Sequence, residues 1–295
     1  MNFKIGGEIP LQQDGLYSYI TDSGRSSLRL ILNTLKDKKF ALPDFLCPVI
    51  IDVFYEMAVE YEFYHVEKNF DFILPDLDVL YVIDYFGRQH WFHPKAPFII
   101  SDMVFSPQVI KLHKPENWIG FNSLRKISPL TDGSIVKSTF HLHKDLIDIN
   151  WSALFTGYKS NNKFEEGEEI LTKQKKIYRI SNHSLFALFD FYYNLENERR
   201  DRQNNFNTLK TFLNIEQLEI QPEFPSFFPI LIDKRDELRE WLRTQNIFLP
   251  VHWPKHPKAP DNPLYDRIIS IPVDSRYTIV DMERVAGLIN GFYNV

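Results

Sequence analysis

At residues 123–133 the chain reads Ser-Leu-Arg-Lys-Ile-Ser-Pro-Leu-Thr-Asp-Gly, which places Lys126 just before a run of turn-forming residues. Two positions upstream complement this lysine. Asp102 closely follows the apolar run at residues 98–100, and Gly24 precedes a helix-like pattern of apolar residues. The carboxyl ends of strands and the N-termini of helices are where α/β folds bind ligands. The sequence therefore predicts an amine, a carboxylate and a helix N-terminus at one site.

These three groups match the needs of one cofactor, pyridoxal 5'-phosphate (PLP). PLP requires an amine that holds its aldehyde as a Schiff base, an anionic partner for its pyridinium nitrogen, and a phosphate cradle at a helix start. Lys126, Asp102 and the helix start at Gly24 provide one candidate for each. We therefore predict PLP as the cofactor.

Composition limits the class of protein. The 295 residues, of which 44% are hydrophobic, are enough to bury a large core, either as one large domain or as a large and a small one. A net charge of −5 provides no basic stripe for a phosphate backbone, so we expect no nucleic-acid partner. Cys47 is the one cysteine, which excludes an internal disulfide, and no spacing of cysteine and histidine predicts a metal site.

The same features predict where the protein works. The first residues lack the apolar run of about 7–15 residues that marks a signal peptide, and no stretch reaches the ~18 apolar residues of a membrane span. A chain with a single cysteine suits a reducing compartment. We expect a cytoplasmic protein with no membrane partner.

Periodicity predicts an α/β fold with a mostly parallel sheet. Apolar residues spaced i, i+3, i+4 and i+7 predict a helix that begins near Gly24 and buries one face, which carries Leu28, Ile31, Leu32 and Leu35. Short apolar runs predict strands at residues 59–66, 79–85 and 98–100, with a helical stretch at 50–58. Such alternation is typical of a sheet covered by helices.

The second half of the chain has a different pattern. Residues 161–176, a run of glutamates followed by lysines, favour a solvated loop, and residues 184–195 predict an aromatic-rich buried helix. A long polar helix at 196–213 leads to a strand, helix, strand, helix unit, whose last helix begins at a capping box of Thr278 and Asp281. We predict a large PLP-binding domain at residues 1–195 and a small α+β domain at residues 196–295.

The order of motifs resembles the DegT/StrS family of PLP-dependent sugar aminotransferases, which have the type I fold of aspartate aminotransferase. The resemblance spans nearly the whole chain and rests on six segments, at residues 23–28, 42–47, 85–87, 100–102, 123–126 and 251–254. It implies a large domain with a mostly parallel sheet and a small C-terminal α+β domain.

The resemblance implies roles for the central residues. Lys126 would form the Schiff base and move the proton during the reaction, and Asp102 would keep the pyridinium nitrogen protonated. Two positions depart from the family pattern. Phe105 stands where a Gln or His often follows the aspartate, and Cys47, with Phe45 nearby, stands where an aromatic ring stacks on the cofactor.

The phosphate is expected at the start of the first helix. Gly24, Arg25 and Ser26 would offer free backbone N–H groups, the positive end of the helix dipole and a guanidinium. Ser123 is a further phosphate ligand, although it lies three residues before the lysine where relatives have a serine five residues before it.

More distant residues also have implied roles. Arg179, in Tyr178-Arg179-Ile180-Ser181, matches the position that reaches the phosphate of the neighbouring subunit, which implies a homodimer with shared sites. His252 matches a substrate-contacting position, and Trp253 and Arg276 are candidates for sugar stacking and for a nucleotide phosphate.

The implied activity is the transfer of an amino group from an amino acid, glutamate being the expected donor, to a keto-sugar, expected to be nucleotide-linked. The alternative from another class is a catalytically degenerate relative that binds a ligand or partner, favoured by Phe105, Cys47 and the early position of the lysine. A dehydratase using the same cofactor would have histidine in place of Lys126, so the lysine argues against it.

Overall fold

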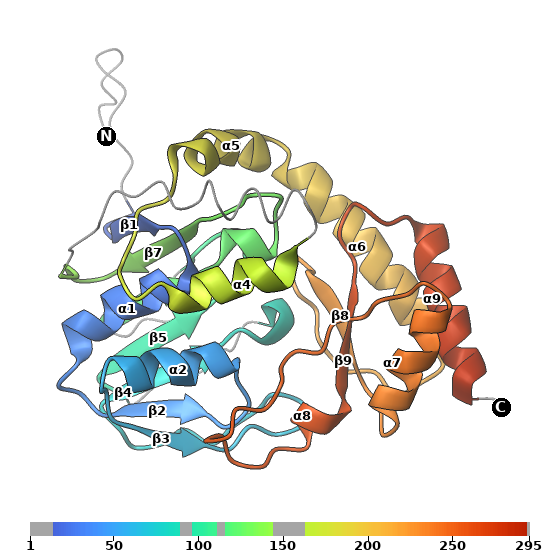
Figure 1. Cartoon of the computed structure of the whole chain (residues 1–295), viewed down its shortest axis with the longest axis horizontal. Coiled ribbons are helices and arrows are strands. Elements are labelled where there is room, and N and C mark those ends of the chain that lie inside the picture. The colour runs from blue at the N-terminus through green and yellow to red at the C-terminus, as the bar shows by residue number, and fades with distance from the viewer. Residues whose placement is uncertain (1–13, 89–95, 111–115, 144–162, 294–295) are drawn as a thin grey trace, which may run out of the picture.

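The fold is built on a seven-stranded sheet whose strands lie in the first half of the chain (Figure 1). The structure is a computed structural model that describes residues 14–88, 96–110, 116–143 and 163–293. The strands are β1 Tyr17–Thr21, β2 Phe40–Pro43, β3 Tyr61–Tyr64, β4 Val79–Ile83, β5 Phe98–Asp102, β6 Asn117–Phe121 and β7 Ser134–Ser138. Their order is β1-β7-β6-β5-β4-β2-β3, and only the pairings that involve β7 are antiparallel. This confirms the predicted mostly parallel α/β sheet.

Helices cover the sheet as the apolar pattern requires. All five residues of β4 are buried, as expected of a parallel strand covered on both faces. Figure 1 shows α1 (Gly24–Leu35) and α2 (Pro48–Glu56) over one face. The predicted apolar stripe of α1 is buried, and Ser23 caps the helix by accepting a hydrogen bond from the N–H of Ser26.

Most of the acidic and basic run is a helix, so the prediction of a solvated loop at residues 161–176 was wrong for Phe164–Lys173. Residues 161 and 162 lie outside the described residues. α4 spans Phe164–Lys173 and lies on the same side of the sheet as α1 and α2 (Figure 1). Two contacts that local sequence does not reveal hold it there. Leu171 packs against Tyr178, and Glu168 pairs with arginines from two other segments.

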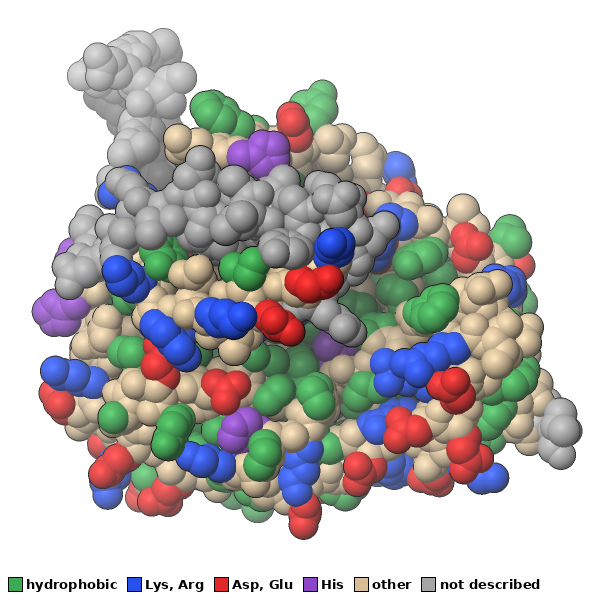
Figure 2. Space-filling model, in the orientation of Figure 1, with side chains coloured by type: hydrophobic (Ala, Val, Ile, Leu, Met, Phe, Trp, Pro, Cys, Tyr) green, Lys and Arg blue, Asp and Glu red, His purple; other side chains and the backbone are tan. Residues whose placement is uncertain are grey.

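The aromatic-rich helix exists, but the prediction that it is buried was wrong. α5 spans Asn182–Tyr193, and Ser184 is its only buried residue. Phe186, Phe189 and Tyr193 are 74%, 73% and 89% exposed. Figure 2 shows hydrophobic side chains projecting outward along the top of the molecule, where Figure 1 places α5.

The C-terminal region forms a separate small layer. It contains α6 Leu195–Phe212, β8 Phe227–Leu231, α7 Arg235–Thr244, α8 Leu264–Arg267, β9 Ile268–Pro272 and α9 Ile279–Tyr293. β8 and β9 pair antiparallel, and α6 packs against α9 and β8 (Figure 1). The predicted capping box is present, since Thr278 N–H donates to Asp281 and Asp281 N–H donates to the Thr278 hydroxyl. The boundary between residues 195 and 196 stays a prediction.

Among the described residues, no helix has both the length and the apolar composition that crossing a bilayer requires. The cytoplasmic location expected from the sequence stays a prediction.

Candidate functional site

A cavity of about 310 Å³ lies at the carboxyl ends of β4, β5 and β6 and is closed on one side by the C-terminal segment 251–253. Its volume is at the lower end of the range for small-molecule sites. It brings together six residues predicted from the sequence, namely Gly24, Arg25, Asp102, Ser123, Lys126 and His252. A larger and more open hollow of about 780 Å³, bounded by Gly87, Lys210 and Gln217, contains none of them.

The stretch at residues 123–133 folds into a tight loop that presents Lys126. Residues Leu124–Lys126 form one 3₁₀ turn directly after β6, anchored by the fully buried Leu124, whose N–H donates to the carbonyl of Gly133. Gly133 has a φ of +127°, and a Cβ there would lie 3.1 Å from Ile180 Cδ1. Its own N–H donates to the carbonyl of Asp22 at 2.6 Å. The glycine therefore ties the lysine loop to the residues that precede α1.

The amine of Lys126 is held in an environment that favours its neutral form. The side chain is accessible because it faces the open cavity, yet protein surrounds it on the other sides. Burial lowers the pKa of Lys126, and the positive charge of Arg125 lowers it further. A lysine of this kind is suited to act as a nucleophile and as a base.

Asp102 is the last residue of β5, as predicted, and its carboxylate has two fixed partners. Tyr81 of β4 donates its hydroxyl to Oδ2 at 2.6 Å, and the N–H of Val104 donates to Oδ1 at 3.1 Å. Burial raises the pKa of Asp102 to about 6, against the effect of these hydrogen bonds. The carboxylate is therefore ionised at neutral pH but close to its titration range.

Cationic groups gather where α1 begins. Arg25, in the first turn of α1, and Arg125 both pair with Glu168, and all three line the cavity with Gly24 and Ser123. Ser26, in contrast, is not among the lining residues. Its hydroxyl donates to the carbonyl of Lys176 and its N–H to Ser23, so the structure does not bring this predicted ligand into the cavity.

His252 and Trp253 form the wall contributed by the C-terminal region. His252 Nδ1 lies 2.9 Å from the hydroxyl of Ser270, and its ring packs edge-on against Phe105. Burial lowers the pKa of His252 to about 3, with Lys126 as a second cause, so the imidazole is neutral. Trp253 stacks parallel to Phe105 with ring centroids 6.4 Å apart. Phe105 thus packs as an apolar wall where a polar residue was expected.

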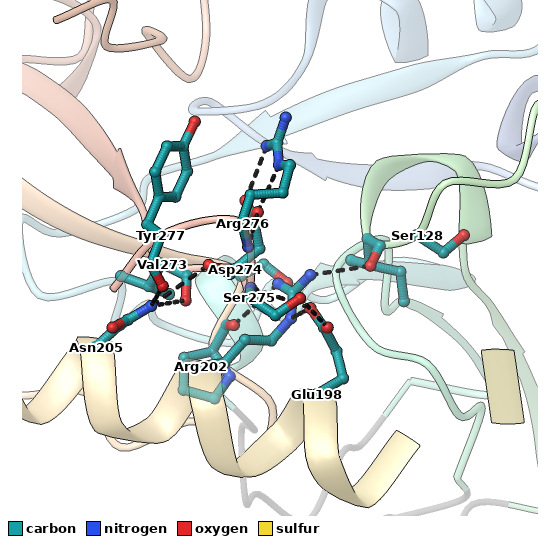
Figure 3. Close-up of polar contacts among 12 residues, drawn as sticks. Ser128, Glu198, Arg202, Asn205, Val273, Asp274, Ser275, Arg276 and Tyr277 are labelled. Atoms are coloured by element: carbon teal, nitrogen blue, oxygen red, sulfur yellow. Dashed lines mark hydrogen bonds and ion pairs between the residues drawn. The ribbon is translucent and has the colours of Figure 1, made fainter. Parts of the chain in front are cut away.

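The remaining candidates lie in different places. Cys47 lines the cavity, whereas Phe45 is fully buried against Tyr85 and is not a lining residue. Arg179 is exposed and pairs with Thr21 in an isolated β-bridge outside the cavity. Its role toward a neighbouring subunit stays a prediction. Arg276 is ion-paired with Asp274 at the surface and is also not a lining residue (Figure 3).

The long helix α6 connects the lysine loop to the C-terminal region. Figure 3 shows Arg202 and Asn205 projecting from α6 toward that region. Arg202, which is buried, donates to the carbonyls of Ile127 at 3.0 Å and Pro225 at 3.2 Å and pairs with Glu198 at 2.6 Å. Asn205 donates to the carbonyls of Val273 and Tyr277. Ile127, the residue after Lys126, is therefore hydrogen-bonded to α6 of the C-terminal layer through the guanidinium of Arg202.

A buried carboxyl beside the α1 N-terminus makes stability pH-dependent. Burial raises the pKa of Asp22 to about 7, and the charge of Asp132 acts in the same direction. A pKa raised by folding stabilises the protein below the unfolded value of about 4, and this stabilisation is lost as the pH rises toward 7. We expect Asp22→Asn to increase the free energy of unfolding at pH 8 by about 1–3 kcal/mol, with little change at pH 4.

Urea denaturation of both proteins across this pH range measures the effect. Replacing the exposed Asp37 with asparagine is the matched control and should leave the pH dependence unchanged. Equal destabilisation of Asp22→Asn at both pH values would contradict the assignment.

Comparison with known proteins gives the fold. No family model and no curated protein matches the chain. Solved structures match over nearly its whole length. The DegT DnrJ EryC1 StrS aminotransferase from Brucella abortus is 15% identical, with a TM-score of 0.63 and coverage of 94% of this chain and 86% of that chain. The chain has the fold of the sugar aminotransferases. This confirms the type I fold and, at the level of fold, the resemblance to the DegT/StrS family.

Two further structures agree. The sugar aminotransferase CalS13 from Micromonospora echinospora is 14% identical, with a TM-score of 0.67 and coverage of 93% and 87% of the two chains. Spr1654 from Streptococcus pneumoniae, in its PLP form, is 11% identical, with a TM-score of 0.63 and coverage of 93% and 86%. The aminotransferase fold therefore accounts for the large sheet and the small C-terminal layer together.

Three residues of this aminotransferase-fold cavity were missed from the sequence. Tyr81 lies in an apolar run and has the pattern of a core residue. Glu168 was assigned to a solvated charge run. Arg125 was given no role, although its position next to Lys126 in the sequence is a signal that could have identified it as a site residue. Each acts through a partner distant in sequence, which periodicity and motifs do not reveal.

Proposed function

We propose that this chain is a PLP-dependent aminotransferase that moves an amino group from an amino acid, with glutamate as the expected donor, to a keto-sugar, expected to be nucleotide-linked. The observation that carries the proposal is the placement of Lys126 and Asp102 in one cavity whose other end is cationic. The sugar-aminotransferase fold supports it, and so does the PLP form of one neighbour.

The donor groups suit PLP. Lys126 offers an amine with a lowered pKa, and Asp102 offers a buried carboxylate for a cationic ring nitrogen. Arg25 already holds an anion, the carboxylate of Glu168, which stands in for a phosphate oxygen. Gly24 and Ser123 complete that end of the cavity. We assign the phosphate to these residues, the ring nitrogen to Asp102 and the aldehyde carbon to Lys126.

When bound, PLP supplies an aldehyde that captures amines and a ring that accepts electrons. The chain contributes proton transfer and electrostatics. Lys126 carries the proton at Nζ, since burial and the charge of Arg125 lower its pKa from the ordinary value of a lysine. Asp102, oriented by Tyr81, would provide the negative charge that a protonated ring nitrogen requires. His252 is neutral and offers a hydrogen bond to substrate without adding a charge.

The test is transfer of ¹⁵N from labelled glutamate to a panel of nucleotide-linked keto-sugars, followed by mass spectrometry, with protein that has been loaded with PLP. Appearance of an aminated sugar supports the proposal. Protein that holds PLP at Lys126 yet transfers no label from any of several amino acids would contradict it.

The alternative is a ligand-binding relative without catalysis. Phe105 and Cys47 favour it, because both line the cavity where relatives are expected to have a polar and an aromatic contact. It predicts that the protein binds nucleotide-sugars whether or not Lys126 is present. Calorimetric titration of Lys126→Ala with PLP and with a nucleotide-sugar separates the two proposals, because only the aminotransferase proposal requires the lysine for retention of PLP.

We also propose that the enzyme is a homodimer and that α5 lies in its interface. Phe186, Phe189 and Tyr193 lie on one face of α5 at i, i+3 and i+7 and are largely exposed. Contiguous exposed apolar surface indicates a protein-protein contact. Arg179 lies three residues before α5 and is exposed, as a residue that reaches a partner's site would be.

A double variant, Phe186→Asp with Phe189→Asp, is expected to convert the dimer to a monomer. Each protomer would place two carboxylates in the two-fold interface, so four charged groups would be buried there. Light scattering after size exclusion measures the mass. Ile73→Asp is the matched control, since Ile73 is 90% exposed but distant from α5 in the sequence. A wild-type monomer at micromolar concentration would contradict the dimer.

A further inference from the structure

Two arginines and one carboxylate form a cluster at the cationic end of the cavity. Arg25 Nη2 lies 3.2 Å from Glu168 Oε2, and Arg125 Nη1 lies 2.6 Å from Glu168 Oε1. Each carboxylate oxygen is thus bound by a guanidinium from a different segment of the chain. The arginine side chains are 13% exposed and that of Glu168 is 40% exposed. The cations are part of the wall, whereas the carboxylate approaches from the open side.

The cluster has an excess of positive charge. Arg25 and Arg125 provide two guanidinium groups for the single carboxylate of Glu168, so these three side chains together carry a net positive charge. Burial on its own would raise the pKa of Glu168, but Arg125, Lys126 and Arg25 together lower it to about 2. Glu168 is therefore ionised throughout the physiological range. Paired guanidinium groups bind carboxylates and phosphates well, and here their partner comes from the chain itself.

Glu168 can leave this position without detaching the segment that carries it. The residues after α4 have their own contacts with the first strand and helix. Tyr178 accepts a hydrogen bond from Asp22 N–H at 3.0 Å, Lys176 accepts one from the Ser26 hydroxyl, and Arg179 bridges Thr21. Figure 2 shows the charged side chains of α4 at the surface of this face. Rotation of one half-exposed side chain would therefore open the two arginines to a ligand.

We propose that Arg25 and Arg125 form an oxyanion subsite of the cavity and that Glu168 occupies it as an internal carboxylate, which an oxyanion group of a ligand displaces. The cofactor phosphate, which we assign to Arg25, Gly24 and Ser123, is one source of this group, and the distal carboxylate of a dicarboxylic amino donor is the other. The occupant is itself a glutamate side chain, so the subsite already binds the chemical group that distinguishes glutamate from a monocarboxylic donor. The identity of these ligands rests on the proposed function, but the subsite does not.

The test compares Glu168→Gln with the wild type in protein without cofactor. Isothermal titration with 2-oxoglutarate and with inorganic phosphate measures affinity directly. Removing an internal competitor raises the fraction of protein able to bind, so we expect about tenfold tighter binding of at least one of these anions. A selective gain for 2-oxoglutarate identifies a donor site, and a selective gain for phosphate identifies a cofactor site. Unchanged or weaker binding of both anions would overturn the proposal.

Matched variants separate charge competition from structural damage. Glu169→Gln removes the adjacent carboxylate of α4, which pairs with Lys173 at 3.9 Å, and should leave both affinities unchanged. Arg125→Met combined with Glu168→Gln should cancel the gain. If Glu168→Gln fails to fold, Glu168→Asp retains the charge on a shorter side chain and should give a smaller gain in the same direction.

The failure of this inference is distinguishable from the failure of the proposed function. Borohydride labelling of Lys126 in the presence of PLP reports on the cofactor site alone. If Lys126 is labelled but Glu168→Gln does not bind anions more tightly, the oxyanion subsite is wrong and the proposed aminotransferase function stands. If Glu168→Gln binds anions more tightly but Lys126 is not labelled, the subsite stands and the proposed PLP site is wrong.

Discussion

Lys126→Ala is expected to abolish the borohydride-reducible absorption band that forms when the protein is incubated with PLP. Among the residues that the structure describes, Lys126 is the one lysine that lines the cavity, and its lowered pKa favours the neutral, nucleophilic form. Amino transfer should fall by at least about 10²–10⁴-fold, the contribution of proton transfer by a positioned side chain, because Lys126 also carries that proton. Absorption spectra, peptide mapping of the reduced protein and the ¹⁵N transfer assay measure the three consequences.

Lys173→Ala is the control, since Lys173 is exposed on α4 and pairs only weakly with Glu169. It should retain the band and the activity. A label spread over several surface lysines in the wild type, with none at Lys126, would contradict the assignment of the cofactor site and favour the ligand-binding alternative.

Asp102→Asn is expected to lower kcat/KM for amino transfer by about 10²–10³-fold, comparable to the loss of one preorganised electrostatic contact in other enzymes. The carboxylate is fixed by Tyr81 and Val104, so asparagine fits the space but lacks the charge that a cationic ring nitrogen requires. Lys126 should still be labelled by PLP and borohydride in this variant. Wild-type kcat/KM in Asp102→Asn would exclude Asp102 as the partner of the ring nitrogen.

The pH dependence of cofactor binding gives an independent measurement for Asp102. The carboxylate has a pKa of about 6, so PLP should bind less tightly as the pH falls below that value. Tyr81→Phe removes a hydrogen bond that stabilises the ionised form, so the loss of binding should begin at a higher pH. Tyr19→Phe is the matched control, because Tyr19 is also a buried strand tyrosine but contacts Leu142 and not Asp102. If the pH below which PLP binding weakens is the same in Tyr81→Phe as in the wild type, a group other than Asp102 causes the pH dependence.

Local sequence rules predicted the parts of the site that lie at the ends of regular elements. Gly24 begins α1 because Ser23 caps it and the apolar residues after it recur with the helical period. Asp102 ends β5 because the apolar run before it forms a strand buried in the sheet. The meeting of Asp102 and Lys126 was predicted from the order of motifs and not from strand ends, because β6, which precedes Lys126, was not predicted.

Tertiary structure decided the contacts that local patterns do not contain. Tyr81 reaches Asp102 because β4 and β5 pair in one register, and its hydroxyl cannot be told from that of a core tyrosine in the sequence. Glu168 meets Arg25 and Arg125 because α4 lies on the same side of the sheet as α1 (Figure 1), although the composition of this segment favours a solvated loop. The sequence predicted that α5 is a helix but not that its aromatic side chains are exposed, since exposure depends on which other segments cover the helix.

The sequence by itself thus determined α1, α5, β4, β5 and the placement of Gly24 and Asp102 at the ends of such elements, since caps, periodicity and strand ends are properties of neighbouring residues. The partners of these groups, the charge balance of the cavity and the uncovered face of α5 were decided by the tertiary structure. The physical reason is that burial and electrostatic interactions act between residues close in space, whatever their separation along the chain.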